Sequence, residues 1–203
     1  MDQNILQQEE RDWYNKALIE NKLEAFNEKN NDIAKNKEWK LWLNDEEMAE
    51  WIREQRKHIL FFDGASKNNP GRVGAGGLIL DPNGKRISTY EWGLGEMSNN
   101  KAESYSFLLG TKILKKKGVK DPIITGDSAI IIVAMETGKE FKSSTINKIS
   151  HRIKINTKNM GKIAYKHVLR IQDKDVDTLV NKAMKRQVGT VKENNKTYEE
   201  NIP

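Results

Sequence analysis

The sequence predicts an α/β domain with a mixed β-sheet, preceded by a helical extension. From His58 onward, short apolar runs bounded by turn residues alternate with segments whose apolar residues recur at helical spacing. Residues 1–57 have a different composition, because they contain no Gly or Pro and carry four of the five tryptophans. We therefore expect an acidic, Trp-rich helical extension at 1–57, a folded domain at 58–188 and a polar, disordered tail at 189–203.

Three strands in a meander are expected at the start of the domain. Apolar runs at 59–62, 78–80 and about 86–94 are separated by turn signals, among them "DPNG" at 81–84. "PIITGDS" indicates a fourth strand and "KIAYKHVL" a fifth, with helical segments between them. This order of elements predicts a sheet with both antiparallel and parallel neighbours.

Four helical segments are expected in the domain. "SNNKAESYSFLLGTKILKKKG" has apolar residues at helical spacing and ends in Gly118, which suits a helix C-terminus. "AIIIVAMETG" is typical of a buried helix, and a lysine-rich helix follows at about 143–157. The last helix lies in "DKDVDTLVNKAMKRQ", where Val176, Leu179 and Val180 repeat on one face.

The extension is expected to form helices at roughly 8–28 and 45–57, with Asn44 or Asp45 as the N-cap of the second. It contains no repeat and no catalytic motif. Two interpretations stay open. Residues 1–57 are either a structural appendage or polyprotein remnant, or an element that binds a protein partner.

The net charge of +6 is unevenly distributed. Residues 1–57 hold 10 Lys and Arg against 14 Asp and Glu, whereas residues 58–203 hold 25 against 15. A basic domain indicates a polyanionic partner such as nucleic acid, with a lysine-rich solvated surface as the alternative. The chain has no cysteine, no apolar run long enough for a membrane span and no signal-peptide pattern. We expect an intracellular protein that is not secreted and has no membrane contact.

Four acids stand at positions where elements end or begin. Asp63 ends the first strand, Asp127 ends the fourth, Glu103 lies in the first turn of a helix and Asp177 lies in the last helix. If strands one and four are neighbours, Asp63 and Asp127 come together. Crowded carboxylates repel one another, and hard oxygen ligands favour Mg²⁺ or Mn²⁺ over zinc. Two such ions about 4 Å apart can activate a water and stabilise the leaving oxygen of a phosphodiester.

Four segments, "FFDGASKNNPG", "SNNKAES", "TGDS" and "HVLRIQDKDVDTLVNKA", resemble in this order the signature segments of the type 1 ribonuclease H family. The resemblance covers about residues 58–187. The segments are most similar to those of plant and retroelement-type sequences. It implies a five-stranded mixed sheet flanked by helices, and two Mg²⁺ ions for which Mn²⁺ can substitute. The implied activity is endonucleolytic hydrolysis of the RNA strand of RNA–DNA hybrids, leaving 5′-phosphate and 3′-hydroxyl ends. The resemblance assigns metal binding to Asp63, Glu103, Asp127 and Asp177.

The resemblance also assigns roles to polar residues around these acids. His167, ten residues before Asp177, matches a histidine on a mobile loop that is thought to assist proton transfer or product release. Contacts to ribose 2′-hydroxyls, which distinguish RNA from DNA, would come from four residues. These residues are Ser66, Asn69, Asn99 and Asn100.

The sequence departs from the family pattern at two positions. Asn68 replaces a glycine usual in the first loop, a change that a turn tolerates because Asn adopts positive φ more readily than other non-glycine residues. Ala129 stands where bacterial relatives often carry a glutamine that touches RNA. One substrate contact is therefore expected to be absent.

Each candidate residue also has an ordinary structural explanation. A strand-end Asp forms turns, a helix-start Glu balances the helix dipole, and asparagines cap helices. Asp173 and Asp175 stand beside Asp177 and could be mistaken for the ligand. The leading function is a Mg²⁺-dependent ribonuclease H, free-standing or as the domain of a reverse-transcribing element. The alternatives are a catalytically silent module of the same fold that binds nucleic acid or protein, and a different nuclease of this fold.

Overall fold

The fold was obtained as a computed structural model that describes residues 45–66, 71–126, 128, 131–132, 135, 137–138, 140–167 and 174–203. The predicted helix at 8–28 lies outside these residues. Six positions singled out by the sequence also lie outside them: Asn44, Asn68, Asn69, Asp127, Ala129 and Asp173.

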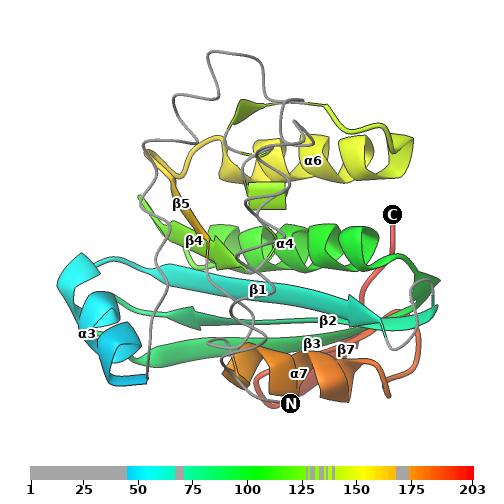
Figure 1. Ribbon diagram of the computed structural model, residues 1–203, viewed down its shortest axis with the longest axis horizontal. Coiled ribbons are helices and arrows are strands. Elements are labelled where there is room, and N and C mark those ends of the chain that lie inside the picture. The colour runs from blue at the N-terminus through cyan, green and yellow to red at the C-terminus, as the bar shows by residue number, and fades with distance from the viewer. Residues whose placement is uncertain are drawn as a thin grey trace, which may run out of the picture.

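Within the described residues, seven strands form one sheet in the order β5-β4-β1-β2-β3-β6-β7 (Figure 1). Strands β1, β2 and β3 are the predicted antiparallel meander, and β4 and β5 add parallel to β1 on its other side. The mixed sheet is thus confirmed, with two further strands beyond the expected five. The bounds are β1 Ile59–Ser66, β2 Gly71–Leu80, β3 Arg86–Met97, β4 Ile123–Gly126, β5 Ala164–His167, β6 Thr190–Glu193 and β7 Lys196–Glu199.

Helices cover both faces of the sheet (Figure 1). On one face lies α4, with α6 packed outside it, and on the other lie α3 and α7. Gly118 follows α4 with a φ of +66°, as the predicted helix end requires. In the predicted helix after β4, Ile131, Ile132, Met135 and Thr137 are helical. The bounds are α3 Asp45–Gln55, α4 Asn99–Lys116, α6 Ser144–Thr157 and α7 Lys174–Ala183.

The core has two layers because successive side chains of a strand point to opposite faces. Leu60 and Phe62 of β1 pack in the layer under α4, whereas Ile59 and Phe61 pack in the layer under α3 and α7. All four side chains are at most 1% exposed, so β1 is buried on both faces. No helix among the described residues is long and apolar enough to span a membrane.

The expectation of a disordered tail at 189–203 is wrong, because β6 and β7 form a hairpin on the edge of β3. Val191 pairs with Trp92 and is fully buried. The side chain of Asn194, at the hairpin turn with a φ of +54°, accepts a hydrogen bond from the backbone N of Thr89 at 2.9 Å. The polar composition of this segment suggested disorder, but the edge of β3 offers unpaired backbone groups with which a polar segment can pair.

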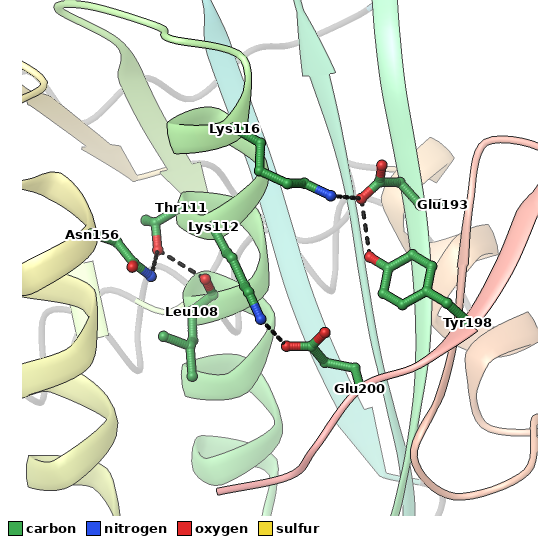
Figure 2. Close-up of polar contacts among 8 residues, drawn as sticks. All are labelled: Leu108, Thr111, Lys112, Lys116, Asn156, Glu193, Tyr198 and Glu200. Carbon is green, nitrogen blue, oxygen red and sulfur yellow. Dashed lines mark hydrogen bonds and ion pairs between the residues drawn. The ribbon is translucent and has the colours of Figure 1, made fainter.

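The hairpin and the residues after it also contact α4 (Figure 2). Lys116 lies 3.5 Å from Glu193, whose carboxylate accepts a 3.0 Å hydrogen bond from the hydroxyl of Tyr198. Lys112 pairs with Glu200 one turn earlier on the helix. These contacts tie the end of the chain to the side of α4.

The boundary expected at 57/58 does not separate α3 from the core. Helix α3 confirms the helix predicted at 45–57, but its Trp51 is only 5% exposed and packs in the same layer as Phe61 and Val180. We therefore count α3 as part of the folded domain.

Candidate active site

Asp63 lies near the middle of β1 and is 3% exposed. Its Oδ1 accepts a hydrogen bond of 2.8 Å from the backbone N of Gly64. By strand alternation its side chain points to the face covered by α7, the face to which Phe61 also points. The apolar run before Asp63 therefore delivers a buried carboxylate to the sheet surface.

Glu103 belongs to α4, which lies on the opposite face of β1. The helix can approach β1 closely there because Gly64 has no side chain. A Cβ at Gly64 would overlap the backbone of Ala102 and Glu103, so α4 rests directly on β1 one residue after Asp63. Glu103 itself is 5% exposed. The expectation that it lies in the first helical turn is wrong by a short margin, because α4 begins at Asn99 and Glu103 is its fifth residue.

Asp177 lies in the first turn of α7 and is half-buried. Its neighbour Val176 is fully buried against the sheet, while Asp175 is exposed and pairs with Arg86 of β3 at 2.7 Å. Residues two apart in a helix differ by about 200° around its axis. Asp177 therefore faces away from β3, towards β1, which distinguishes it from Asp175. Its Oδ2 accepts a 3.3 Å hydrogen bond from the side chain of Asn181.

The fourth strand lies beside β1, as predicted, and the fifth lies beyond the fourth. Gly126 of β4 pairs with Phe62 on one side and with His167 of β5 on the other. Asp127, the next residue after Gly126, lies outside the described residues, and of His167 only the backbone is described. The structure thus places β4, which precedes Asp127, next to β1, and β5, which carries His167, one strand further away.

The predicted substrate-binding residues that can be placed lie at one end of the sheet. Ser66 is the last residue of β1, although its side chain is not described. Asn99 and Asn100 open α4, directly after Ser98, whose hydroxyl caps the helix by accepting from the backbone N of Lys101. Asn99 is half-buried and Asn100 is exposed, and the carbonyl of Asn100 accepts a 2.8 Å bond from the hydroxyl of Ser104.

A metal-binding cluster is not complete within the part of the chain that the structure describes. No three acidic or histidine side chains there are grouped closely enough to hold an ion. Asp63 and Glu103 offer the buried oxygen donors that a hard cation prefers. Asp127, another of the four predicted metal-binding acids, lies outside the described residues.

A cavity of about 230 Å³ lies elsewhere, between α4, α6 and the end of the chain. Its wall includes Trp92, Leu109, Arg152 and Pro203, and none of the predicted site residues. It is therefore separate from the acids of the candidate site.

One buried carboxylate was missed by the sequence analysis. Glu91 of β3 is 5% exposed and forms an ion pair with Arg186 just after α7, at 2.8 Å. The available signal was its place between Tyr90 and Trp92, inside an apolar strand, where a glutamate needs a partner. The partner is 95 residues away in the sequence, so the pattern alone could not supply it.

A family described as "Reverse transcriptase-like" matches residues 61–183. The matched region extends from β1 to the end of α7 and so includes all four predicted metal-binding acids. No curated protein sequence matches the chain.

Solved structures of ribonucleases H are similar to this chain. RNase H1 from the halophilic archaeon Halobacterium salinarum is 22% identical, with a TM-score of 0.59 over 63% of this chain and 96% of that one. LC11-RNase H1 from compost, solved with an RNA/DNA hybrid, is 25% identical, with a TM-score of 0.59 over 63% and 96%. A foamy viral protease–reverse transcriptase, also solved with a hybrid, is 13% identical, with a TM-score of 0.52 over 74% and 22%. These matches confirm the predicted fold.

Proposed function

Because the chain belongs to the reverse transcriptase-like family and has the fold of ribonuclease H, we propose that it hydrolyses the RNA strand of RNA–DNA hybrids. The observation that carries this proposal is that two buried carboxylates, Asp63 on β1 and Glu103 on α4, belong to elements whose backbones touch at Gly64. Two carboxylates buried there are unfavourable to keep ionised, and a divalent cation is the usual means of balancing them.

Four acids would hold two Mg²⁺ ions, or Mn²⁺ in their place: Asp63, Glu103, Asp127 and Asp177. When bound, the ions activate the attacking water and stabilise the leaving oxygen. The protein fixes the donors on three rigid elements, since Asp63 is on β1, Glu103 on α4 and Asp177 on α7. Cleavage in this manner leaves a 5′-phosphate and a 3′-hydroxyl.

His167 is proposed to move a proton between its imidazole and the reacting oxygens or to assist product release. The support is its place at the end of β5, one strand beyond β4. A neutral imidazole near pH 7 can both accept and donate a proton, as such a role requires.

Selectivity for RNA is proposed to come from Ser66, Asn69, Asn99 and Asn100. The start of α4 follows β3, whose Met97 pairs with Gly71 near the end of β1, so Asn99 and Asn100 lie at the same end of the sheet as Ser66. Amide and hydroxyl groups there can exchange hydrogen bonds with the 2′-hydroxyls of a shallow minor groove.

A cleavage assay tests the proposed function. Labelled RNA–DNA, RNA–RNA and DNA–DNA duplexes are incubated with the full chain in Mg²⁺ and in EDTA, and the ends of the products are identified. We expect cleavage of the RNA strand of the hybrid in Mg²⁺ alone. Binding of the hybrid without cleavage would favour the catalytically silent module instead. The context, free-standing or within a reverse-transcribing element, stays a prediction.

A further inference from the structure

Helix α7 and the turn after it approach the backbone of β2 and β3 closely at three positions that lack a side chain, beside the apolar contacts of Val176 and Val180. Three glycines face the helix and the turn after it: Gly74 and Gly76 on β2, and Gly93 on β3. A Cβ at Gly74 would lie 2.5 Å from the backbone N of Met184, and one at Gly76 would lie 2.9 Å from that of Val180. A Cβ at Gly93 would lie 2.6 Å from a backbone oxygen of the segment after α7. We call these three residues the glycine seat.

Asp63 and Glu91 flank this seat. Asp63 pairs with Gly76 across β1 and β2, and Gly76 pairs with Glu91 across β2 and β3. Residues on one such row have side chains on the same face, so both carboxylates point towards α7 with the seat between them. Adjacent strands are about 4.8 Å apart, which separates the two Cα atoms by about 10 Å.

Glu91 is bound to the end of α7 through Arg186. The Nε of Arg186 donates to Oε2 of Glu91 at 2.8 Å, and the backbone carbonyl of Arg186 accepts a 3.2 Å hydrogen bond from the guanidinium of Arg72. The backbone N of Arg186 donates to the carbonyl of Ala183, the last residue of α7. Arg186 is thereby continuous with the helix, and the ion pair joins that helix to the centre of β3.

The glycine seat makes the position of α7 depend on this ion pair. The three glycines let the helix approach closely, but at these positions no side chain of the sheet resists sliding or rolling of the helix. The apolar contacts of Val176 and Val180 are non-directional. A buried ion pair has defined geometry, and the loss of one partner leaves a buried charge uncompensated. The Glu91–Arg186 pair is thus suited to fix α7 along and around its axis.

We propose that Glu91 is a positioning residue, which holds α7 on the glycine seat through Arg186 and thereby places Asp177 on the side of Asp63. This inference rests on the proposed function, in which Asp177 is a metal ligand. Asp177 and Arg186 stand at opposite ends of one rigid helix and its closing turn. A displacement at the Arg186 end is therefore transmitted to Asp177. Glu91 itself is not assigned any contact with metal or substrate.

The test compares Glu91→Gln with the wild-type chain. The variant keeps the side-chain shape and loses the charge. Three readouts are taken: amide hydrogen exchange of residues 176–187 in EDTA, Mg²⁺ binding by calorimetry without nucleic acid, and hybrid cleavage as a function of Mg²⁺. We expect faster exchange in α7, about 10- to 100-fold weaker Mg²⁺ binding, and an unchanged KM for hybrid.

Glu193→Gln is the matched control, because it removes the ion pair with Lys116 on the α4 side of the sheet. It should leave all three readouts unchanged. If Glu91→Gln does not fold, Arg186→Lys, which keeps the charge but loses the fixed geometry of the guanidinium, takes its place in the same comparison.

Equal behaviour of the Glu91 and Glu193 variants in exchange and Mg²⁺ binding would overturn the inference. A loss of cleavage with unchanged Mg²⁺ binding would also overturn it, because Glu91 would then not act through Asp177. If the wild-type chain does not cleave hybrid, the proposed function fails, whereas exchange and calorimetry still decide the role of Glu91.

Discussion

Phe62 on β1 and Gly126 on β4 are direct partners in a parallel ladder. The residue after Phe62 is Asp63, and the residue after Gly126 is Asp127. The expectation that strands one and four are neighbours is therefore confirmed, and it is the geometric basis for assigning both acids to one site.

Asp63→Asn is expected to abolish hybrid cleavage while hybrid binding is retained or improved. The change removes a buried charge that is proposed to bind metal, and it also reduces repulsion of the phosphates. Loss of a metal ligand should remove several kcal/mol of transition-state stabilisation. Single-turnover cleavage and fluorescence anisotropy of labelled hybrid measure the two effects. Mg²⁺-dependent turnover within about tenfold of the wild type would contradict the assignment.

Asp177→Asn and Asp175→Asn are expected to differ sharply, although the residues are two apart. Asp177 faces β1, so its change should lower cleavage by at least about 100-fold, in line with the loss of a metal ligand. Asp175 pairs with Arg86 and its side chain is 71% exposed, so its change should leave cleavage intact and shift stability by about 1 kcal/mol at most. Cleavage rates and urea denaturation of both variants check this. Equal loss of cleavage in the two variants would sink the orientation argument.

His167→Ala is expected to lower turnover by about 10²- to 10⁴-fold, the usual contribution of a proton carrier. Mg²⁺ binding should not change, because the imidazole is assigned no contact with the ions. Calorimetric titration with Mg²⁺ and the pH–rate profile separate the two roles. Loss of Mg²⁺ binding would make His167 a ligand instead.

The sequence predicts the strands of the central sheet and the helices that cover it, because their apolar periodicity is strong and their boundaries carry turn residues. Gly118 and Ser98 mark the ends of α4 by local chemistry alone. The hairpin at 190–199 was missed because Val191 and Tyr198 are stabilised by β3 and α4, which lie far away in the sequence. Local composition cannot reveal such partners.

For the candidate site, the sequence motifs predict individual residues but not how those residues are oriented. Asp63 and Glu103, which the motifs mark, are both buried and lie on elements whose backbones touch. The inference that Asp177 and Asp175 face different ways depends on the contact between Asp175 and Arg86, which the apolar periodicity of the sequence does not reveal. The role of Glu91 follows from the strand register and from its ion pair with Arg186, so only the folded structure could identify it.

Stability at alkaline pH should depend on Tyr165. Burial raises the pKa of Tyr165 to about 12, from 10.0 in an unperturbed side chain. The unfolded chain therefore loses this proton first, and the corresponding stability is complete below pH 10 and disappears as the pH rises towards 12. The difference amounts to about 2–3 kcal/mol. Urea denaturation at several pH values should give a shallower decline for Tyr165→Phe than for the wild type. Parallel declines would show that Tyr165 ionises equally in both states.

Truncation of the extension should be tolerated up to α3 and not beyond it. A chain that starts at Asp45 keeps Trp51, which is 5% exposed and packs in the layer that contains Phe61 and Val180. A chain that starts at Arg56 loses this side chain and leaves a cavity in that layer. Removal of a buried tryptophan typically destabilises by about 3–5 kcal/mol, a large part of the stability of a domain of this size. Trp51→Ala in the longer chain should reproduce the loss, as measured by circular dichroism during thermal unfolding. If the chain from Arg56 unfolds at the same temperature as the chain from Asp45, α3 is an appendage after all, and the boundary expected at 57/58 is restored.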